Sequence, residues 1–204
     1  HLQIANIQAQ RLALSGFSFA GSDIGGFAEQ PNGELYARWI QLGAFHPFCR
    51  THSSGDHGDQ EPWAFDEEIT DVVRKFIEIR YELLPYLYTS FYHYSKDNIP
   101  MLKSLVLFDQ EDSHTHYRTD EFVCGNQILI CPINEPNSKG RRMYIPRGEW
   151  FNFWNKEVIS GGKETWVDAE LDSMPIFVKA GAVIPKYPVQ QYVGEKNIDQ
   201  LTLD

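Results

Sequence analysis

The sequence predicts an α/β part followed by an all-β part. Residues 17–20 and 45–49 are short apolar runs, and residues 34–42 between them suit a helix. A strand, a helix and a second strand in this order form a βαβ unit, whose two strands are parallel. From Pro100 onward, short runs rich in β-forming residues alternate with turn residues, which is typical of an antiparallel β-sandwich.

The other helical segments follow from apolar spacing and capping residues. Residues 2–14 predict a helix that carries, on or near one face, Ile4, Ile7 and Leu14. Asp66 is a good N-cap, because its side chain can accept from a free N–H of the first turn. The side chains of this later helix that should face the core are Ile69, Val72, Val73, Phe76, Ile77 and Leu84. Pro85 should kink or break the helix, and Asp97-Asn98 should close the helical part.

The β part is predicted from runs of β-forming residues separated by turns. The runs are residues 103–108, 127–131, 142–145, 149–153, 164–167 and 176–179. Pro146-Arg-Gly148 and Gly161-Gly162 are turn signals between them. Residues 192–204 indicate a linker and an unfinished strand.

Composition excludes several classes of protein. The 204 residues carry a formal net charge of −10, which argues against binding to nucleic acid or to an anionic membrane surface. No apolar run is long enough to span a bilayer. The three cysteines form no Cys-x-x-Cys pair, so neither a disulfide framework nor a zinc site is indicated. A pair between Cys124 and Cys131 is one alternative, and buried free thiols are the other.

Polar side chains follow both predicted strands of the βαβ unit. Asp23 lies in a glycine-rich loop after the first strand, and Arg50 and His52 follow the second. Because parallel strands end at the same face, these three side chains are expected to converge there. Residues 16–27 taken alone favour an ordinary strand followed by a polar turn over a binding site.

A series of motifs extends over nearly the whole chain. They are Gly21-Ser-Asp-Ile-Gly-Gly-Phe27, Arg38-Trp39, Gly43-Ala-Phe-His-Pro-Phe48, Arg50-Thr-His52, Glu61-Pro-Trp63, Arg80-Tyr-x-Leu-Leu-Pro-Tyr-x-Tyr88 and Met174-Pro-Ile-Phe-Val-Lys-Ala-Gly-Ala-Val-Ile-Pro185. In this order they resemble glycoside hydrolase family 31, which contains α-glucosidases, α-xylosidases and related enzymes. Any one of these motifs alone would be weak.

The resemblance implies a division into three parts. Residues 1–98 would be the C-terminal part of a (β/α)8 catalytic barrel, with its last two strands and closing helices. Residues 99–187 would be a proximal C-terminal β-sandwich, and residues 188–204 a linker or the start of a distal β domain. The chain starts with neither methionine nor a signal-peptide pattern, so it is expected to be a fragment that begins inside the barrel.

The resemblance also implies a retaining mechanism with two carboxyl groups about 5 Å apart, one nucleophile and one acid/base. In the family both groups precede the part that this chain matches, so no catalytic role is assigned to any residue here. No metal and no cofactor are expected. The isolated chain is expected to be inactive.

The part of the active site that this chain matches is expected to bind the sugar. Asp23 matches an acid that shapes the subsite of the cleaved sugar, against the alternative of a loop cap. Phe27 matches an aromatic wall of the same pocket, with core packing as its rival. His52 matches a histidine that bonds sugar hydroxyls, although a lone histidine is usually structural. Arg50 is expected to clamp Asp23 or a buried acid, chiefly as a structural role.

The implied function is that of part of an α-glucosidase that releases glucose from the non-reducing ends of α-glucosides, with an oligosaccharide or α-glucoside as substrate. In the α-xylosidase branch of the family a Trp-Ser-His often precedes the matching Asp. This chain has Ala20-Gly-Ser22 there, which favours glucose over xylose. The alternatives are an α-xylosidase, a transglycosylase, or a non-catalytic carbohydrate-binding β module suggested by aromatic residues 150–154. Compartment and oligomeric state stay undetermined.

Overall fold

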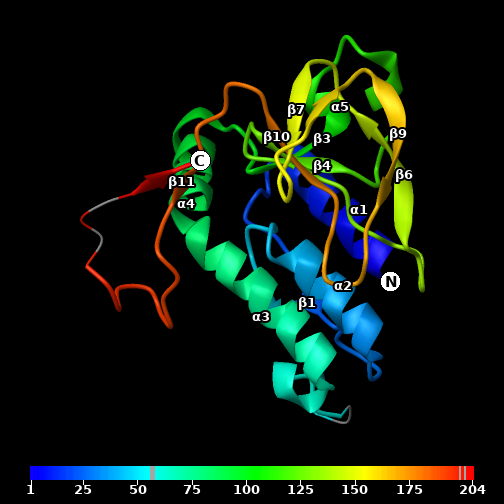
Figure 1. The fold of residues 1–204 in the computed structure, drawn as a ribbon, viewed down its shortest axis with the longest axis vertical. Helices are drawn as coiled ribbons and strands as arrows, with labels where there is room; N and C mark the ends of the chain where they lie inside the picture. Colours follow the sequence, from blue (N-terminus) through cyan, green and yellow to red (C-terminus); the bar gives the residue numbers. More distant parts are fainter. Residues whose placement is uncertain (56–57, 198, 200) are drawn as a thin grey trace.

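The computed structural model describes residues 1–55, 58–197, 199 and 201–204. Figure 1 shows a helical part, built from the first half of the chain, beside a β part built from the second half. The helices are α1 (Leu2–Leu14), α2 (Gly33–Gly43), α3 (Glu67–Glu82), α4 (Leu84–Asp97) and α5 (Leu105–Phe108), with short 3-10 turns at Pro62–Ala64 and Ser113–Thr115. The strands are β1 (Asp23–Ile24), β2 (Arg50–Thr51), β3 (Leu102–Ser104), β4 (Phe122–Cys124), β5 (Ile128–Ile130), β6 (Gly140–Ile145), β7 (Glu149–Asn152), β8 (Val158–Ser160), β9 (Lys163–Asp168), β10 (Ile176–Lys179), β11 (Pro185–Lys186) and β12 (Thr202–Leu203).

The βαβ unit is present, but its strands lie later in the chain than predicted. β1 and β2 pair in parallel, with α2 between them, which confirms the expected connection. The positions at residues 17–20 and 45–49 were wrong. The N–H groups of Ala44, Phe45 and His46 donate to carbonyls three or four residues earlier, so the chain is still turning out of α2 there. The second strand therefore begins only at Arg50, where the chain becomes extended. The parallel pair contains two residues of each strand.

The bounds of α1 were predicted correctly, whereas its buried face was not. Ile4 and Leu14 are 55% and 52% exposed. The buried side chains are instead Leu2, Ala5, Asn6, Ala9, Gln10 and Ala13. Alanines let the helix approach its neighbours closely. The buried amide nitrogens have acceptors, because Asn6 Nδ2 donates to the backbone carbonyl of residue 120 and Gln10 Nε2 to that of residue 119.

The cap and the break of the later helices are confirmed. The carboxylate of Asp66 accepts from Ile69 N–H at 2.9 Å and starts α3. The helix is interrupted at Leu83, two residues before Pro85, and α4 ends at Asn98 in a left-handed conformation with φ of 57°. Four of the six expected core side chains, residues 69, 72, 73 and 76, are buried. Ile77 is 39% exposed and Leu83 takes the buried place expected for Leu84, because the break rotates the chain.

The β part is antiparallel, as predicted. Its larger sheet has the order β3-β4-β5-β10-β7-β8, and β6 pairs with β9 separately. The predicted strand at residues 103–108 was wrong in its second half, since Leu105–Phe108 is a helical turn closed by the bond from Asp109 N–H to Leu105 O. β4 and β8 lie outside the predicted runs. The unfinished strand predicted near the end of the chain is β12, which pairs with β11.

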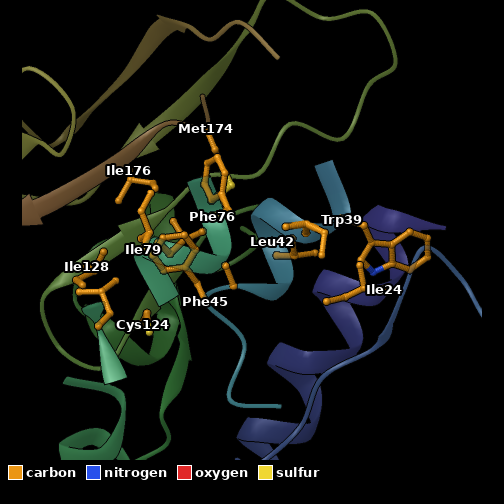
Figure 2. Close-up of a cluster of buried hydrophobic side chains, with 14 of the residues drawn as sticks. Ile24, Trp39, Leu42, Phe45, Phe76, Ile79, Cys124, Ile128, Met174 and Ile176 are labelled. Atoms are coloured by element: carbon orange, nitrogen blue, oxygen red, sulfur yellow. The ribbon is translucent and has the colours of Figure 1, made fainter. Parts of the chain in front are cut away.

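The central strands of the larger sheet are buried on both faces. Alternate side chains of β4, β5 and β10 point one way and join the core of the helices; these are Phe122, Cys124, Ile128, Ile130 and Ile176. Figure 2 shows several of them close to Phe45, Phe76 and Ile79. The residues between them, Val123, Leu129 and Phe177, join a second cluster with Met143, Ile145 and Trp150. The sheet thus lies between the helices and the β6–β9 pair, and one continuous core links the helical part to the sheet.

Among the described residues, Cys49, Cys124 and Cys131 are free, and the last two are buried, which decides against the disulfide alternative. None of the described helices combines the length and the apolar character needed to cross a bilayer.

Candidate functional site

The parallel register sets Asp23 opposite Arg50. The two residues are direct cross-strand partners of β1 and β2. Arg50 Nε donates to Asp23 Oδ1 at 2.6 Å, a charge-assisted hydrogen bond. The carboxylate of Asp23 is 22% exposed, and no described residue donates to its second oxygen, Oδ2. The site therefore presents an oriented carboxylate with one oxygen available to a ligand.

The loop after β1 has no room for a side chain at Gly25. Gly25 has φ of +89°, and a Cβ there would lie 2.8 Å from Gln60 Oε1 and 3.1 Å from the Tyr36 ring. Gln60 is buried, and its Nε2 donates to Gly26 O at 3.2 Å. Gln60 therefore holds the loop that follows Asp23 from the other side.

Contacts from the loop before β1 and from α3 position the segment that leads into β2. The chain at Gly21 passes so close to Phe48 that a Cβ would be 1.9 Å from its carbonyl oxygen. Phe48 N–H also donates to Ala20 O at 3.2 Å. From α3, the guanidinium of Arg80 donates to three carbonyls of residues 44, 46 and 47. The segment that carries Arg50 is thereby held beside Asp23 by backbone contacts on one side and by the Arg80 side chain on the other.

A cavity of about 650 Å³ opens at this end of the two strands. Asp23, Phe27 and Arg50 line it together with Trp39 and Phe48. Trp39 is anchored because its Nε1 donates to Ser22 Oγ at 2.8 Å. Phe27 is 52% exposed, so its ring is not packed into the core of the described chain.

His52 does not line this cavity. It borders a neighbouring one of about 400 Å³, together with Asp59, Gln60 and Glu61. The ring centroids of Phe27 and His52 are 5.5 Å apart, so the two cavities meet at this aromatic pair. Asp56, which the sequence places in the same acidic loop, lies outside the described residues.

Sequence reasoning missed the residues that support the site. It assigned no role to Trp39, Phe48 or Gln60. The signal for Trp39 was its place in the Arg38-Trp39 motif, whereas a buried Gln60 in a polar loop has no signature in one sequence. Together these groups form a cavity with a carboxylate, a guanidinium and aromatic walls, which suits a polyhydroxylated ligand. The described residues contain no group of three or more His, Cys, Asp or Glu that could hold a metal ion.

Comparison with known sequences identifies relatives of both parts of the chain. The family model "Glycosyl hydrolases family 31 TIM-barrel domain" matches residues 1–90, and "Glycosyl hydrolase family 31 C-terminal domain" matches residues 98–184. Alpha-glucosidase 2 of Bacillus thermoamyloliquefaciens is 41% identical over 184 residues, which is 90% of this chain and 23% of that protein. Neutral alpha-glucosidase AB of Mus musculus is 35% identical over 189 residues, covering 92% of this chain and 20% of that protein.

Solved structures agree with these matches. A family 31 dextranase from Flavobacterium johnsoniae, complexed with glucose, superposes with a TM-score of 0.90 at 33% identity, over 96% of this chain and 25% of that one. A cycloalternan-forming enzyme from Listeria monocytogenes, in complex with a pentasaccharide substrate, has a TM-score of 0.92 at 29% identity, over 98% and 21% of the two chains. The chain thus spans about a fifth to a quarter of these proteins. The matches cover both parts of the chain in the order of the family, and the chain belongs to glycosyl hydrolase family 31.

Proposed function

We propose that this chain is the sugar-gripping portion of a retaining α-glycoside hydrolase, an α-glucosidase that releases glucose from the non-reducing ends of α-glucosides. The observation that carries the proposal is the Asp23–Arg50 pair, which lines a cavity with an aromatic wall. The names of the relatives, two of them alpha-glucosidases, support the choice of sugar. In this proposal residues 1–98 are the end of a (β/α)8 barrel, 99–187 a β-sandwich, and 188–204 a linker or the start of a distal β domain.

Each predicted site residue has a defined task in the proposal. Asp23 accepts hydrogen bonds from sugar hydroxyls through Oδ2, while Arg50 fixes the carboxylate through Oδ1. Phe27 offers one side of its ring to the sugar. His52 bonds a hydroxyl from the neighbouring cavity, across the Phe27 ring. The nucleophile and the acid/base are supplied by other parts of the enzyme, so the 204-residue chain alone hydrolyses nothing.

The test is the variant Asp23→Ala in the full-length enzyme. Loss of a charged hydrogen bond costs about 1.5–3 kcal/mol, which corresponds to a drop in kcat/KM of about 10- to 150-fold on nitrophenyl α-glucoside. Asp71→Ala, a substitution of an exposed carboxylate on α3, is the matched control and should leave kcat/KM unchanged. A folded Asp23→Ala enzyme with the wild-type kcat/KM would show that Asp23 is only a loop cap. Assays on nitrophenyl α-xyloside distinguish the α-xylosidase alternative.

Transglycosylation is a second candidate, because the cycloalternan-forming enzyme is among the similar structures. Product analysis with maltose separates the two reactions. A hydrolase yields only glucose, whereas a transglycosylase also yields trisaccharides or longer products.

A further inference from the structure

An exposed tryptophan on the β part lies next to a cleft that the proposed site does not use. Trp166 of β9 is 56% exposed. Its side chain points away from the core, because Thr165 and Val167 on either side are the half-buried residues of this strand. The cleft has a volume of about 320 Å³ and is lined by Trp166, Arg142, Asn134, Glu135, Gln3 and Arg141, among others. Figure 1 shows β6 and β9 side by side at the edge of the β part, near the N-terminal end of α1.

The indole of Trp166 is held in one orientation. Its Nε1 donates to Asp168 Oδ1 at 2.7 Å, two residues along the same strand. One edge of the ring lies over the backbone of Gly140, where a Cβ would be 3.1 Å from ring atom Cζ2. A ring fixed by a hydrogen bond and by a backbone contact loses little conformational freedom when a ligand covers it. Trp166 is therefore a preorganised flat platform.

The cleft beside this platform is built on a rigid base. The guanidinium of Arg141 donates to the carbonyls of Asp120 and Pro132 at 3.0 and 2.7 Å, and to Glu121 Oε1 at 3.1 Å. Asn137 N–H in the adjoining loop donates to Glu34 of α2 at 2.8 Å. The rim of the cleft is thus tied to both the strands and the helices, and it does not need to rearrange when a ligand binds.

Several polar side chains around Trp166 have no hydrogen-bond partner among the described residues. The side chains of Gln3, Glu135 and Arg142 make no hydrogen bond to any described residue, although they line the cleft. Arg142 is the direct cross-strand partner of Trp166, so the two side chains leave the strand pair on the same face, and both line the cleft. Asn134 Oδ1 is buried and likewise accepts nothing from the part of the chain that the structure describes. An amide, a carboxylate and a guanidinium provide both donors and acceptors.

We propose that this cleft is a second carbohydrate-binding site, which takes a short segment of an α-glucan on the face of Trp166. The flat face of a glucose ring presents C–H groups, whose partly positive hydrogens suit the negative face of an indole. Its equatorial hydroxyls point sideways and can reach the polar groups at the rim of the cleft. The two tryptophans among residues 150–154 do not offer such a platform. Trp150 is fully buried, and Trp154 Nε1 donates to Met174 O. The identity of the sugar rests on the proposed function, but the platform and its polar rim do not.

The test is affinity electrophoresis of the full-length enzyme in gels that contain amylopectin or dextran. Saturating 1-deoxynojirimycin, a glucose mimic, is added to occupy a glucose subsite at the catalytic centre. Trp166→Ala should raise the apparent Kd for at least one polysaccharide about 10-fold or more, equivalent to about 1.4 kcal/mol. Its kcat/KM on nitrophenyl α-glucoside should stay within about twofold of wild type, because so small a substrate does not reach the cleft.

Two further variants make the result specific. Trp63→Ala removes another exposed tryptophan, 77% exposed, that lines a different cavity, and its Kd should equal that of the wild type. Arg142→Ala keeps the platform and should raise the Kd several-fold, which keeps the proposal testable if Trp166→Ala melts early. The proposal is overturned if the wild type is not retarded by either polysaccharide, if Trp166→Ala and Arg142→Ala are retarded like the wild type, or if Trp63→Ala weakens binding equally. If the wild-type enzyme is retarded in the polysaccharide gels but has no glucosidase activity, the proposed function is refuted and the proposed second binding site is not.

Discussion

Arg80 of α3 is expected to control the local stability of the segment that carries Arg50. Its Nη1 donates to Ala44 O at 2.8 Å and His46 O at 2.7 Å, and its Nη2 donates to Pro47 O at 3.0 Å. These carbonyls belong to the buried turn between α2 and β2. One charged side chain therefore satisfies three backbone acceptors that no neighbouring strand satisfies in the described structure.

The size of the effect follows from these bonds. A hydrogen bond to a charged donor contributes about 1.5–3 kcal/mol, and contributions within one network are not additive. We therefore expect Arg80→Ala to lower the free energy of local opening by about 2–4 kcal/mol. At about 1.36 kcal/mol per factor of ten, amide exchange in this segment would be about 30- to 900-fold faster.

Hydrogen exchange measured by mass spectrometry on the full-length protein tests this without a two-state assumption. The reporting peptides should span residues 44–52, which include the bond from Phe48 N–H to Ala20 O. Arg74→Ala is the matched control on the same helix. Among the residues that the structure describes, Arg74 pairs only with Asp71, and both side chains are about 60% exposed, so its loss should cost no more than about 0.5 kcal/mol.

The reasoning would be refuted if exchange in residues 44–52 were the same in Arg80→Ala as in Arg74→Ala. A second readout follows from the position of the segment. Because it leads into Arg50 and His52, kcat/KM of Arg80→Ala should fall at temperatures where the enzyme stays folded, and Arg74→Ala should show no such fall.

Two further predictions concern the loop after β1 and a buried acid. Gly25→Ala should destabilise the loop by about 1–3 kcal/mol, because it forces a Cβ against Gln60 at a positive φ. Melting curves measure this loss, and Gly55→Ala, where a Cβ meets open space, is the control. Burial, with repulsion from Asp120, raises the pKa of Glu121 to about 7 from 4.5. The folded state therefore favours the protonated acid, so the stability that this group contributes is present below pH 4.5 and is lost as the pH rises towards 7. Glu121→Gln should make the melting temperature less dependent on pH across this window, and an unchanged profile would contradict it.

Local features were readable from the sequence. The Asp66 cap, the break ahead of Pro85 and the end of α4 at Asn98 each depend on contacts within about four residues, which the order of residues specifies. The alternation of short β-forming runs with turn residues predicted an antiparallel β part, although β4 and β8 lie outside the predicted runs. The motifs identified the family, and the parallel βαβ connection followed from the order of the elements.

Other features were decided only when distant segments met. The sequence predicted an Ile4–Leu14 face for α1, yet Ala5, Ala9 and the amide side chains are buried, because carbonyls of residues 119 and 120 lie within reach. Asp23 and Arg50 were predicted to converge and do so, but His52 borders a separate cavity behind Phe27. The sequence by itself determined which local turns, caps and strand periods this chain forms, since those depend on neighbouring residues. The tertiary structure decided which faces are buried and which polar groups share a cavity, because those depend on partners far away in the sequence, such as the carbonyls of residues 119 and 120 for α1.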